Sequence, residues 1–150
     1  MRFTGKVQFR SSIRPGIGPP GEAEVLALNP ERATRILAAT GWDRLEPGSL
    51  NLGVENSVVE ALLNMKPSLV ESSASVRYPA PYQHIPASKR AYHYYRAVAD
   101  IRSMTQDVLV RRALMNPVSG RVELFAPVRL KQQFGLAAGD SVTVQLCDTS

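Results

Sequence analysis

Alternation of apolar and polar residues is the strongest pattern in this chain. From Phe3 to Arg10, apolar residues or glycine occupy every second position, which predicts a strand with one buried face. The positions assigned to that face are Phe3, Gly5, Val7 and Phe9. Residues 141–146 alternate in the same way, with Val142, Val144 and Leu146 facing inward. Further strands are predicted over Glu22–Leu28, Ser49–Val54, Tyr92–Ile101, Asp107–Leu114 and Arg121–Phe125.

Short helices are predicted from their boundary residues. Asn29-Pro30-Glu31 combines an N-cap, a proline suited to the first helical position and an acidic first turn, and Gly41 ends that helix. The segment Ser57–Glu60 has the spacing of a capping box, which predicts a helix running to Met65. Residues 126–134 form one or two helical turns that stop at Gly135. Between residues 66 and 90, only the proline-containing segment 78–82 has a predicted conformation, which is extended.

These elements predict a mainly β fold: a small barrel with two or three short helices, formed by a single domain over residues 1–150. A chain of 150 residues is long enough for one hydrophobic core. No apolar run exceeds four residues, so no membrane-spanning helix is predicted. The first residues contain no apolar signal segment, and we therefore expect a cytoplasmic protein. The single cysteine, Cys147, has no partner for an internal disulfide.

The charge balance favours an anionic partner. Eighteen basic residues against 13 acidic ones give a net charge of +5, which suits a nucleotide, a nucleic acid or a phosphorylated substrate. The same charge is equally compatible with a surface that only keeps the protein soluble. The basic residues are scattered and form no long run, so nucleic acid is not an expected partner.

Two segments resemble a known family. Pro47-Gly48-Ser49-Leu50-Asn51-Leu52 is similar to the Gly-Thr-Leu-Asn-Leu signature of the archaeal CTP-dependent riboflavin kinases. The segment Val122–Lys131, followed by Phe134-Gly135-Leu136 and Gly139-Asp140, resembles the C-terminal block of the same family. The resemblance implies a six-stranded cradle-loop barrel, which agrees with the six or seven short strands that the pattern predicts. It also implies phosphoryl transfer from CTP to riboflavin with Mg²⁺, giving FMN.

By this resemblance, Ser49 and Asn51 are the Mg²⁺ ligands, with Ser49 in place of the family's threonine. A hydroxyl and an amide carbonyl on one strand face are hard oxygen donors of the kind Mg²⁺ prefers. The nucleotide is expected at two segments. One is the glycine-containing loop, whose candidate residues are Gly16, Ile17, Gly18, Gly21, Glu22 and Ala23. The other is Val128-Arg129-Leu130-Lys131, in which Arg129 and Lys131 supply positive charge.

Glu123 corresponds to the family's flavin-contacting glutamate, and it alternates with the apolar residues Val122 and Leu124. It is the candidate catalytic residue, either binding the flavin or its ribityl chain or assisting deprotonation of the attacking hydroxyl. Two departures from the family pattern stand beside these matches. The glycine loop is longer and contains two prolines, and the family's upstream flavin-contacting threonine has no counterpart in Ala113–Asn116.

The leading prediction is therefore a CTP-dependent riboflavin kinase-like enzyme, a monomer or weak homo-oligomer. The two departures motivate an alternative, a barrel of the same fold that binds a nucleotide or another small ligand without catalysis. A third hypothesis is a swapped-hairpin DNA-binding regulator, because the C-terminal block also occurs in such proteins and the chain is basic.

Overall fold

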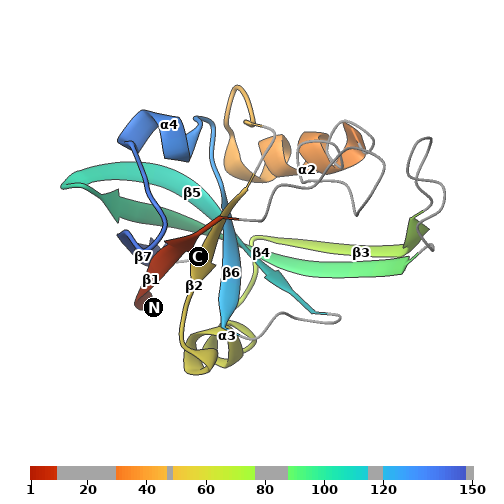
Figure 1. Ribbon diagram of the computed structural model, residues 1–150. Coiled ribbons are helices and arrows are strands. Elements are labelled where there is room, and N and C mark those ends of the chain that lie inside the picture. Colours follow the sequence, from red (N-terminus) through yellow and green to blue (C-terminus); the bar gives the residue numbers. More distant parts are fainter. Residues whose placement is uncertain (10–29, 47–48, 77–87, 115–119, 148–150) are drawn as a thin grey trace, which may run out of the picture.

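A computed structural model describes residues 1–9, 30–46, 49–76, 88–114 and 120–147. Within these residues the chain forms seven strands and three helices (Figure 1). The strands are β1 (Arg2–Gln8), β2 (Leu50–Gly53), β3 (Leu69–Val76), β4 (Ser88–Ile101), β5 (Met104–Ala113), β6 (Arg121–Phe125) and β7 (Ser141–Leu146). The helices are α2 (Pro30–Thr40), α3 (Asn56–Leu62) and α4 (Leu130–Phe134). The predicted glycine loop, the strand Glu22–Leu28, the turn at 47–48 and the extended segment 78–82 lie outside the described residues.

Six of the strands close into an antiparallel barrel. The hydrogen-bonded order runs β4-β5-β6-β2-β1-β7, and β7 pairs again with β4 to complete the ring. Closure satisfies every edge of the sheet within the barrel, which an open sheet cannot do. The prediction of a mainly β fold built on a small six-stranded barrel with two or three short helices is confirmed.

The seventh strand, β3, lies outside the ring. It pairs only with the first half of β4, while the second half of β4 pairs with β7. The result is a two-stranded extension that projects from the barrel wall (Figure 1). The sequence analysis assigned no strand here, because Glu71-Ser72-Ser73-Ala74-Ser75 has neither alternating apolar residues nor β-branched side chains. Pairing with β4 supplies the order that the local sequence lacks.

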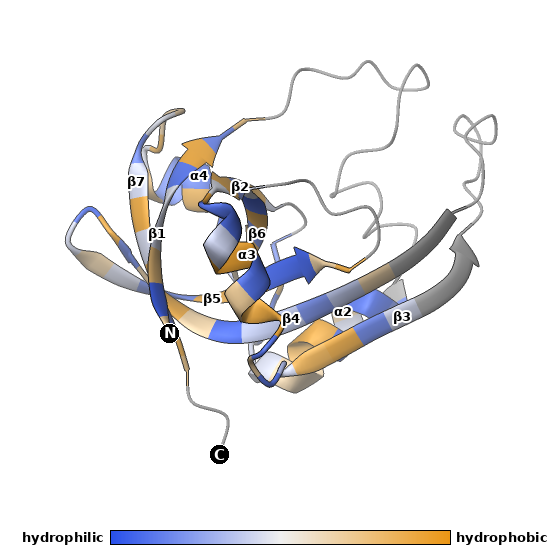
Figure 2. Ribbon diagram, turned by 90° about the horizontal axis from the view of Figure 1, so that it is seen from below, coloured by the Kyte–Doolittle hydropathy of each residue, from blue (hydrophilic) through white to orange (hydrophobic). Residues whose placement is uncertain are grey.

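The barrel interior is the main hydrophobic core. Inward residues from all six barrel strands are buried there, and the alternation that places them is visible in Figure 2 as changes between blue and orange along the strands. Val59 and Leu62 of α3 join this core at one end of the barrel, where α3 lies across the opening (Figure 2). Leu130 and Phe134 of α4 join the same core. The short helices therefore complete the core at the positions where strands alone leave it open.

Helix α2 covers the outer face of the wall rather than an end. Its buried Ile36 forms a second cluster with Tyr94, Leu109 and Phe125, and Trp42 packs against this cluster directly after the helix. The predicted start at Pro30 and stop at Gly41 are both observed. Gly41 has φ = 75°, the left-handed conformation that ends many helices and that suits glycine. Gly135 ends α4 in the same conformation, with φ = 59°.

Three local predictions need correction. Phe9 was assigned to the buried face, but β1 ends at Gln8 and the Phe9 side chain is exposed. The capping box at Ser57 is not formed: α3 begins at Asn56, and its N-cap, Glu55, makes no side-chain capping bond. The helical turn near the C-terminus begins only at Leu130, because residues 127 and 128 form a bend and Arg129 has an extended backbone. Among the described residues, no helix has the length and apolar character needed to cross a membrane.

Candidate functional site

A cleft of about 380 Å³ opens beside α4 and contains several of the predicted site residues. Ser49 lines it from the segment that leads into β2, and residues 128–131 line it from the two residues before α4 and the first two residues of that helix. Leu50, Leu124 and Ala126 line it from the barrel wall. Two segments that the same family resemblance singled out, about 80 residues apart in the chain, therefore share one cleft.

Backbone contacts hold the two sides of this cleft together. The Glu46 N–H donates to the Ala126 carbonyl at 3.0 Å, joining the approach to β2 with the exit from β6. Leu50 and Leu124 are Cα partners in the β2–β6 pair, and both are buried in the barrel. Leu130 is buried as well, so it anchors the segment in which Arg129 and Lys131 sit. The cleft thus rests on rigid elements.

Glu46 is a charged residue of the cleft that the sequence analysis missed. The Arg129 Nε donates to Glu46 Oε1 at 2.6 Å, and the Arg44 Nη2 donates to Glu46 Oε2 at 2.7 Å. These bonds, first from Arg129 and then from Arg44, hold the pKa of the Glu46 carboxyl below its ordinary value. No local motif marks Glu46, because its main partner is 83 residues away in the sequence.

Lys131 also lies where the resemblance expects a charge, with a partner of its own. Its Nζ sits 4.3 Å from the centre of the Phe9 ring, a cation–π contact. This contact explains where the exposed Phe9 side chain goes once β1 has ended at Gln8. The four-residue segment Val128–Lys131 thus contributes both an arginine and a lysine to the cleft.

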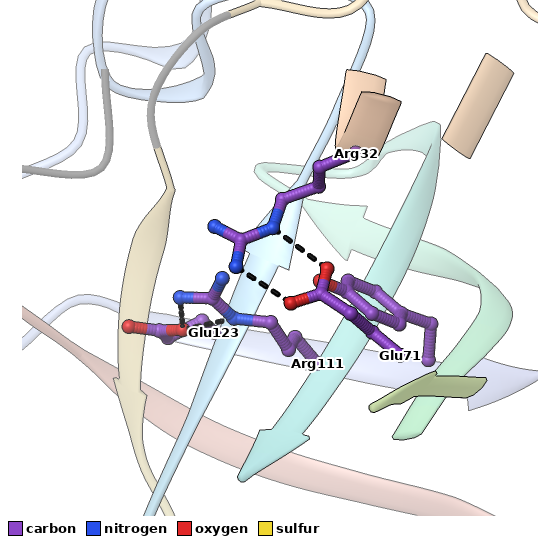
Figure 3. Close-up of polar contacts among 5 residues, drawn as sticks. Arg32, Glu71, Arg111 and Glu123 are labelled. Carbon is purple, nitrogen blue, oxygen red and sulfur yellow. Dashed lines mark hydrogen bonds and ion pairs between the residues drawn. The ribbon is translucent and has the colours of Figure 1, made fainter. Parts of the chain in front are cut away.

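Glu123 lies on the outer face of the barrel wall, next to Asn51. The two are Cα partners across β2 and β6, and Arg111 is the partner of Glu123 on the other side, across β5 and β6. Arg111 Nε donates to Glu123 Oε2 at 2.6 Å, and Arg111 Nη2 pairs with the same oxygen (Figure 3). The Arg111 side chain is only 3% exposed. Glu123 is therefore held in an ion pair that sequence analysis did not anticipate.

A second ion pair lies behind the first. Arg32 of α2 binds Glu71 of β3 through two bonds, Nε to Oε1 at 2.7 Å and Nη2 to Oε2 at 2.6 Å (Figure 3). The Tyr94 hydroxyl donates to Glu71 Oε1 at 3.1 Å. Burial raises the pKa of Tyr94 well above its ordinary value, so this hydroxyl stays protonated and remains a donor.

The Tyr92 ring lies between the two arginines of this face. The Arg111 guanidinium carbon is 4.3 Å from the ring centre, and that of Arg32 is 5.5 Å from it. Arg111 also lies 4.9 Å from the centre of the Phe125 ring. We call Arg32, Glu71, Tyr92, Tyr94, Arg111 and Glu123 the buried ion-pair face. Its charges are paired and covered by aromatic rings, as charges removed from water must be.

Asn51 adjoins the buried ion-pair face, and its side chain carries a buried polar atom that lacks a hydrogen-bond partner. The residue is 6% exposed, and among the described residues its Oδ1 has no hydrogen-bond partner. A buried carbonyl oxygen without a partner costs about 1–3 kcal/mol, so such an atom calls for a ligand, an ion or a water molecule. Asn51 is not among the described residues lining the cleft, whereas Ser49, two positions earlier, is.

The oxygen donors at β2 fit Mg²⁺. The hard oxygen donors here are the unpartnered Asn51 amide oxygen, the Ser49 hydroxyl and the nearby Glu123 carboxylate. Mg²⁺ usually keeps several waters besides one or two protein ligands. The described residues contain no group of three or more His, Cys, Asp or Glu side chains that could form a metal site by themselves. A metal at β2 therefore depends on the Asn51 and Ser49 oxygens and on ligand oxygens.

The fold and the site together define a closed six-stranded β-barrel with a charged cleft at α4 and an unpaired amide oxygen on the adjoining wall. Neither the protein-family models nor the curated proteins contain a match to this chain. The candidate nucleotide residues Gly16, Ile17, Gly18, Gly21, Glu22 and Ala23 lie outside the described residues.

Proposed function

We propose that this protein is a CTP-dependent riboflavin kinase-like phosphotransferase that makes FMN from riboflavin with Mg²⁺. The observation that carries the proposal is the unpartnered Asn51 Oδ1, buried beside Glu123 on the strand that Ser49 precedes. Asn51 Oδ1 is a hard oxygen donor without a protein partner, and the resemblance assigns this residue to the metal. Ser49 and residues 128–131 line one cleft, and this supports the assignment of the nucleotide to residues 128–131.

Phosphoryl transfer needs little reactive chemistry from the protein, since positioning and charge stabilisation supply most of the rate. Arg129 and Lys131 bind the phosphates of the nucleotide and neutralise part of their charge. Asn51 and Ser49 are the residues that would hold Mg²⁺ through their side-chain oxygens, and the ion would supply positive charge against the negative charge that develops during the transfer. The acceptor hydroxyl oxygen bonds to the γ-phosphorus while the bond from that phosphorus to the β,γ-bridging oxygen breaks; CDP leaves with that oxygen, and the hydroxyl proton passes to water.

Glu123 has its place in this scheme set by Arg111. A carboxylate held by a buried guanidinium keeps a fixed direction and retains lone pairs for a second donor. It accepts a hydrogen bond from the riboflavin ribityl chain and orients the attacking hydroxyl. This role requires positioning of the acceptor and does not require Glu123 to leave its ion pair.

The proposal is tested by measuring FMN formation from riboflavin with CTP or ATP in the presence of Mg²⁺. We expect turnover with CTP, a large loss in Ser49→Ala, and no change in Ser57→Ala, a matched serine-to-alanine change on α3 away from the cleft. Turnover by the wild-type protein no higher than that of Ser49→Ala contradicts the proposal.

A second variant separates metal binding from folding. Asn51→Leu keeps roughly the same side-chain volume but removes the unpartnered oxygen, so we expect FMN formation to be lost without any loss of stability. Removing that desolvated atom favours the folded state by up to about 1–3 kcal/mol. If Asn51→Leu unfolds more easily than the wild type, the Asn51 amide serves the fold, and a loss of FMN formation in this variant no longer supports the proposed metal role.

One observation favours a second candidate, a barrel that binds a nucleotide or another small ligand without catalysis. Glu123 is engaged by Arg111 in the buried ion-pair face, so the candidate catalytic carboxylate already has a fixed structural partner. Calorimetric titration with riboflavin and with CTP, followed by the turnover assay, distinguishes the two. Tight binding of either ligand with no FMN formed favours the binding protein.

A further inference from the structure

Two arginines from distant parts of the chain meet on one carboxylate at the cleft. Arg44 follows α2, Arg129 precedes α4, and each donates to a different oxygen of Glu46. The Glu46 side chain is 12% exposed, while the side chains of Arg44 and Arg129 are 70% and 67% exposed. The acid is therefore nearly buried and the two guanidinium groups stand in solvent around it.

The geometry of these bonds leaves the arginines able to bind a second anion. A guanidinium has five N–H donors, and a carboxylate oxygen at Nε occupies one side of it. A phosphate takes the terminal edge, formed by Nη1 and Nη2, through two parallel bonds. Arg129 meets Glu46 through Nε, so its terminal edge is not consumed by the observed bond. Arg44 meets Glu46 through one Nη2 hydrogen, and the observed bond leaves its Nε, its Nη1 and the second Nη2 hydrogen as donors.

The charge and the support of the cleft point to the same ligand chemistry. Arg129 and Lys131 line the cleft and Arg44 joins it through Glu46, so three positive charges surround one negative charge. The backbone of Glu46 is tied to Ala126, which fixes the carboxylate to the barrel. A rigid acid that holds flexible arginines reduces the conformational entropy they lose when they bind a ligand.

We propose that Glu46 arranges Arg44 and Arg129 as a two-arginine clamp for a polyphosphate chain, which makes Arg44 a phosphate-binding residue and Glu46 a positioning residue. That the polyphosphate belongs to a nucleotide rests on the proposed function. The clamp itself requires only the phosphates.

The test uses the full chain and calorimetric titration with inorganic tripolyphosphate and with CTP. Arg44→Ala is compared with Arg2→Ala, which removes the same charge from an equally exposed arginine that pairs with Asp100, away from the cleft. We expect Arg44→Ala to weaken tripolyphosphate binding about tenfold or more, the loss of one charge-assisted bond. Arg2→Ala should change it by less than about twofold, the effect of one remote, screened charge.

A double-mutant cycle tests the positioning role of Glu46. In the Glu46→Gln background, Arg44 is no longer held by a charged carboxylate, so we expect Arg44→Ala to cost several-fold less than in the wild type. An equal cost in both backgrounds overturns the positioning role. Equal affinities of Arg44→Ala and Arg2→Ala, or no tripolyphosphate binding by the wild type, overturn the clamp.

These outcomes are distinguishable from failure of the proposed function. FMN formation that is indifferent to Arg44→Ala leaves the kinase proposal in place and removes the clamp. Tripolyphosphate binding that depends on Arg44, in a protein that forms no FMN, leaves the clamp in place and removes the kinase proposal.

Discussion

The buried ion-pair face and the cleft at α4 use the same chemistry in opposite surroundings. In both, arginines donate to glutamates at 2.6–2.7 Å. On the buried face, the arginine side chains of Arg32 and Arg111 are 2% and 3% exposed, whereas those of Arg44 and Arg129 in the cleft are more than half exposed. The degree of burial decides whether an arginine–glutamate pair is needed for folding or leaves its arginine donors available to a ligand.

The physical reason is desolvation. A charge buried away from water must be fully paired. If it loses its partner, the folded state bears the full free-energy cost of an unpaired buried ion. A charge in solvent keeps its hydration, so it can move from one partner to another at little cost. The buried ion-pair face therefore holds α2 and β3 on the barrel, while the cleft is the region suited to binding and release.

The largest expected effect comes from breaking the Arg32–Glu71 pair. Arg32→Ala leaves the buried Glu71 carboxylate without its bidentate partner and should lower the free energy of unfolding by about 3–5 kcal/mol. Urea denaturation followed by circular dichroism measures the change. In the double variant Arg32→Met/Glu71→Leu both charges are gone, so most of the stability should return. A double variant as unstable as Arg32→Ala contradicts desolvation as the cause.

The next effect is a loss of stability at alkaline pH. Burial raises the pKa of Tyr94, and to a lesser degree that of Tyr95, above the ordinary value of 10.0. The unfolded chain therefore loses these protons first, and the folded state becomes less favoured as the pH rises above about 10. For Tyr94 the slope should approach about 1.4 kcal/mol per pH unit. Urea midpoints between pH 8 and 11 measure it, and Tyr94→Phe should have a shallower slope.

At neutral pH, Tyr94→Phe has a smaller effect. The change removes one donor to Glu71 Oε1 while Arg32 stays bound to the same carboxylate, so the expected loss is about 1 kcal/mol. The urea midpoint at pH 7 measures this loss, and the gap between Tyr94→Phe and Arg32→Ala sharpens the comparison within the buried face. A loss as large as that of Arg32→Ala shows that the hydroxyl, not the arginine, holds Glu71.

The smallest effect belongs to the cleft. The folded-state pKa of Glu46 is lowered, so its ion pairs add stability above the ordinary value of 4.5, and that stability is lost as the pH falls through the folded pKa. Because the partners are exposed, we expect Glu46→Gln to leave the thermal midpoint at pH 7 nearly unchanged. It should also remove a small, salt-sensitive part of the acid destabilisation. A loss of stability in Glu46→Gln comparable to that of Arg32→Ala contradicts the difference we infer between the cleft and the buried ion-pair face.

How far the sequence predicted this molecule depends on the range of the interactions. The strands Arg121–Phe125 and Ser141–Leu146 were predicted with their observed bounds, because alternation and turn residues are local signals. The stop at Gly41 is equally local. Strand β3 was missed because its order comes from β4, and the capping box failed because the spacing of Ser57 and Glu60 does not fix where a helix starts.

The site divides along the same line. The motifs indicated Ser49, Asn51, Glu123 and residues 128–131, and the barrel brings Ser49 to that segment and Asn51 to Glu123. The charged partners of these residues carried no signal, since Glu46 meets Arg129 across 83 positions and Arg111 meets Glu123 across 12.

The sequence by itself determined the class of fold, most of the strands and which residues carry charge and oxygen donors, because periodicity, turns and residue chemistry act over a few positions. Only the tertiary structure decided which charges are buried together and which stand in solvent at the cleft. Barrel closure and the packing of α2 set the distances between remote side chains and the amount of water around them. The distances and the hydration together determine whether an arginine–glutamate pair stabilises the fold or is available to bind a ligand.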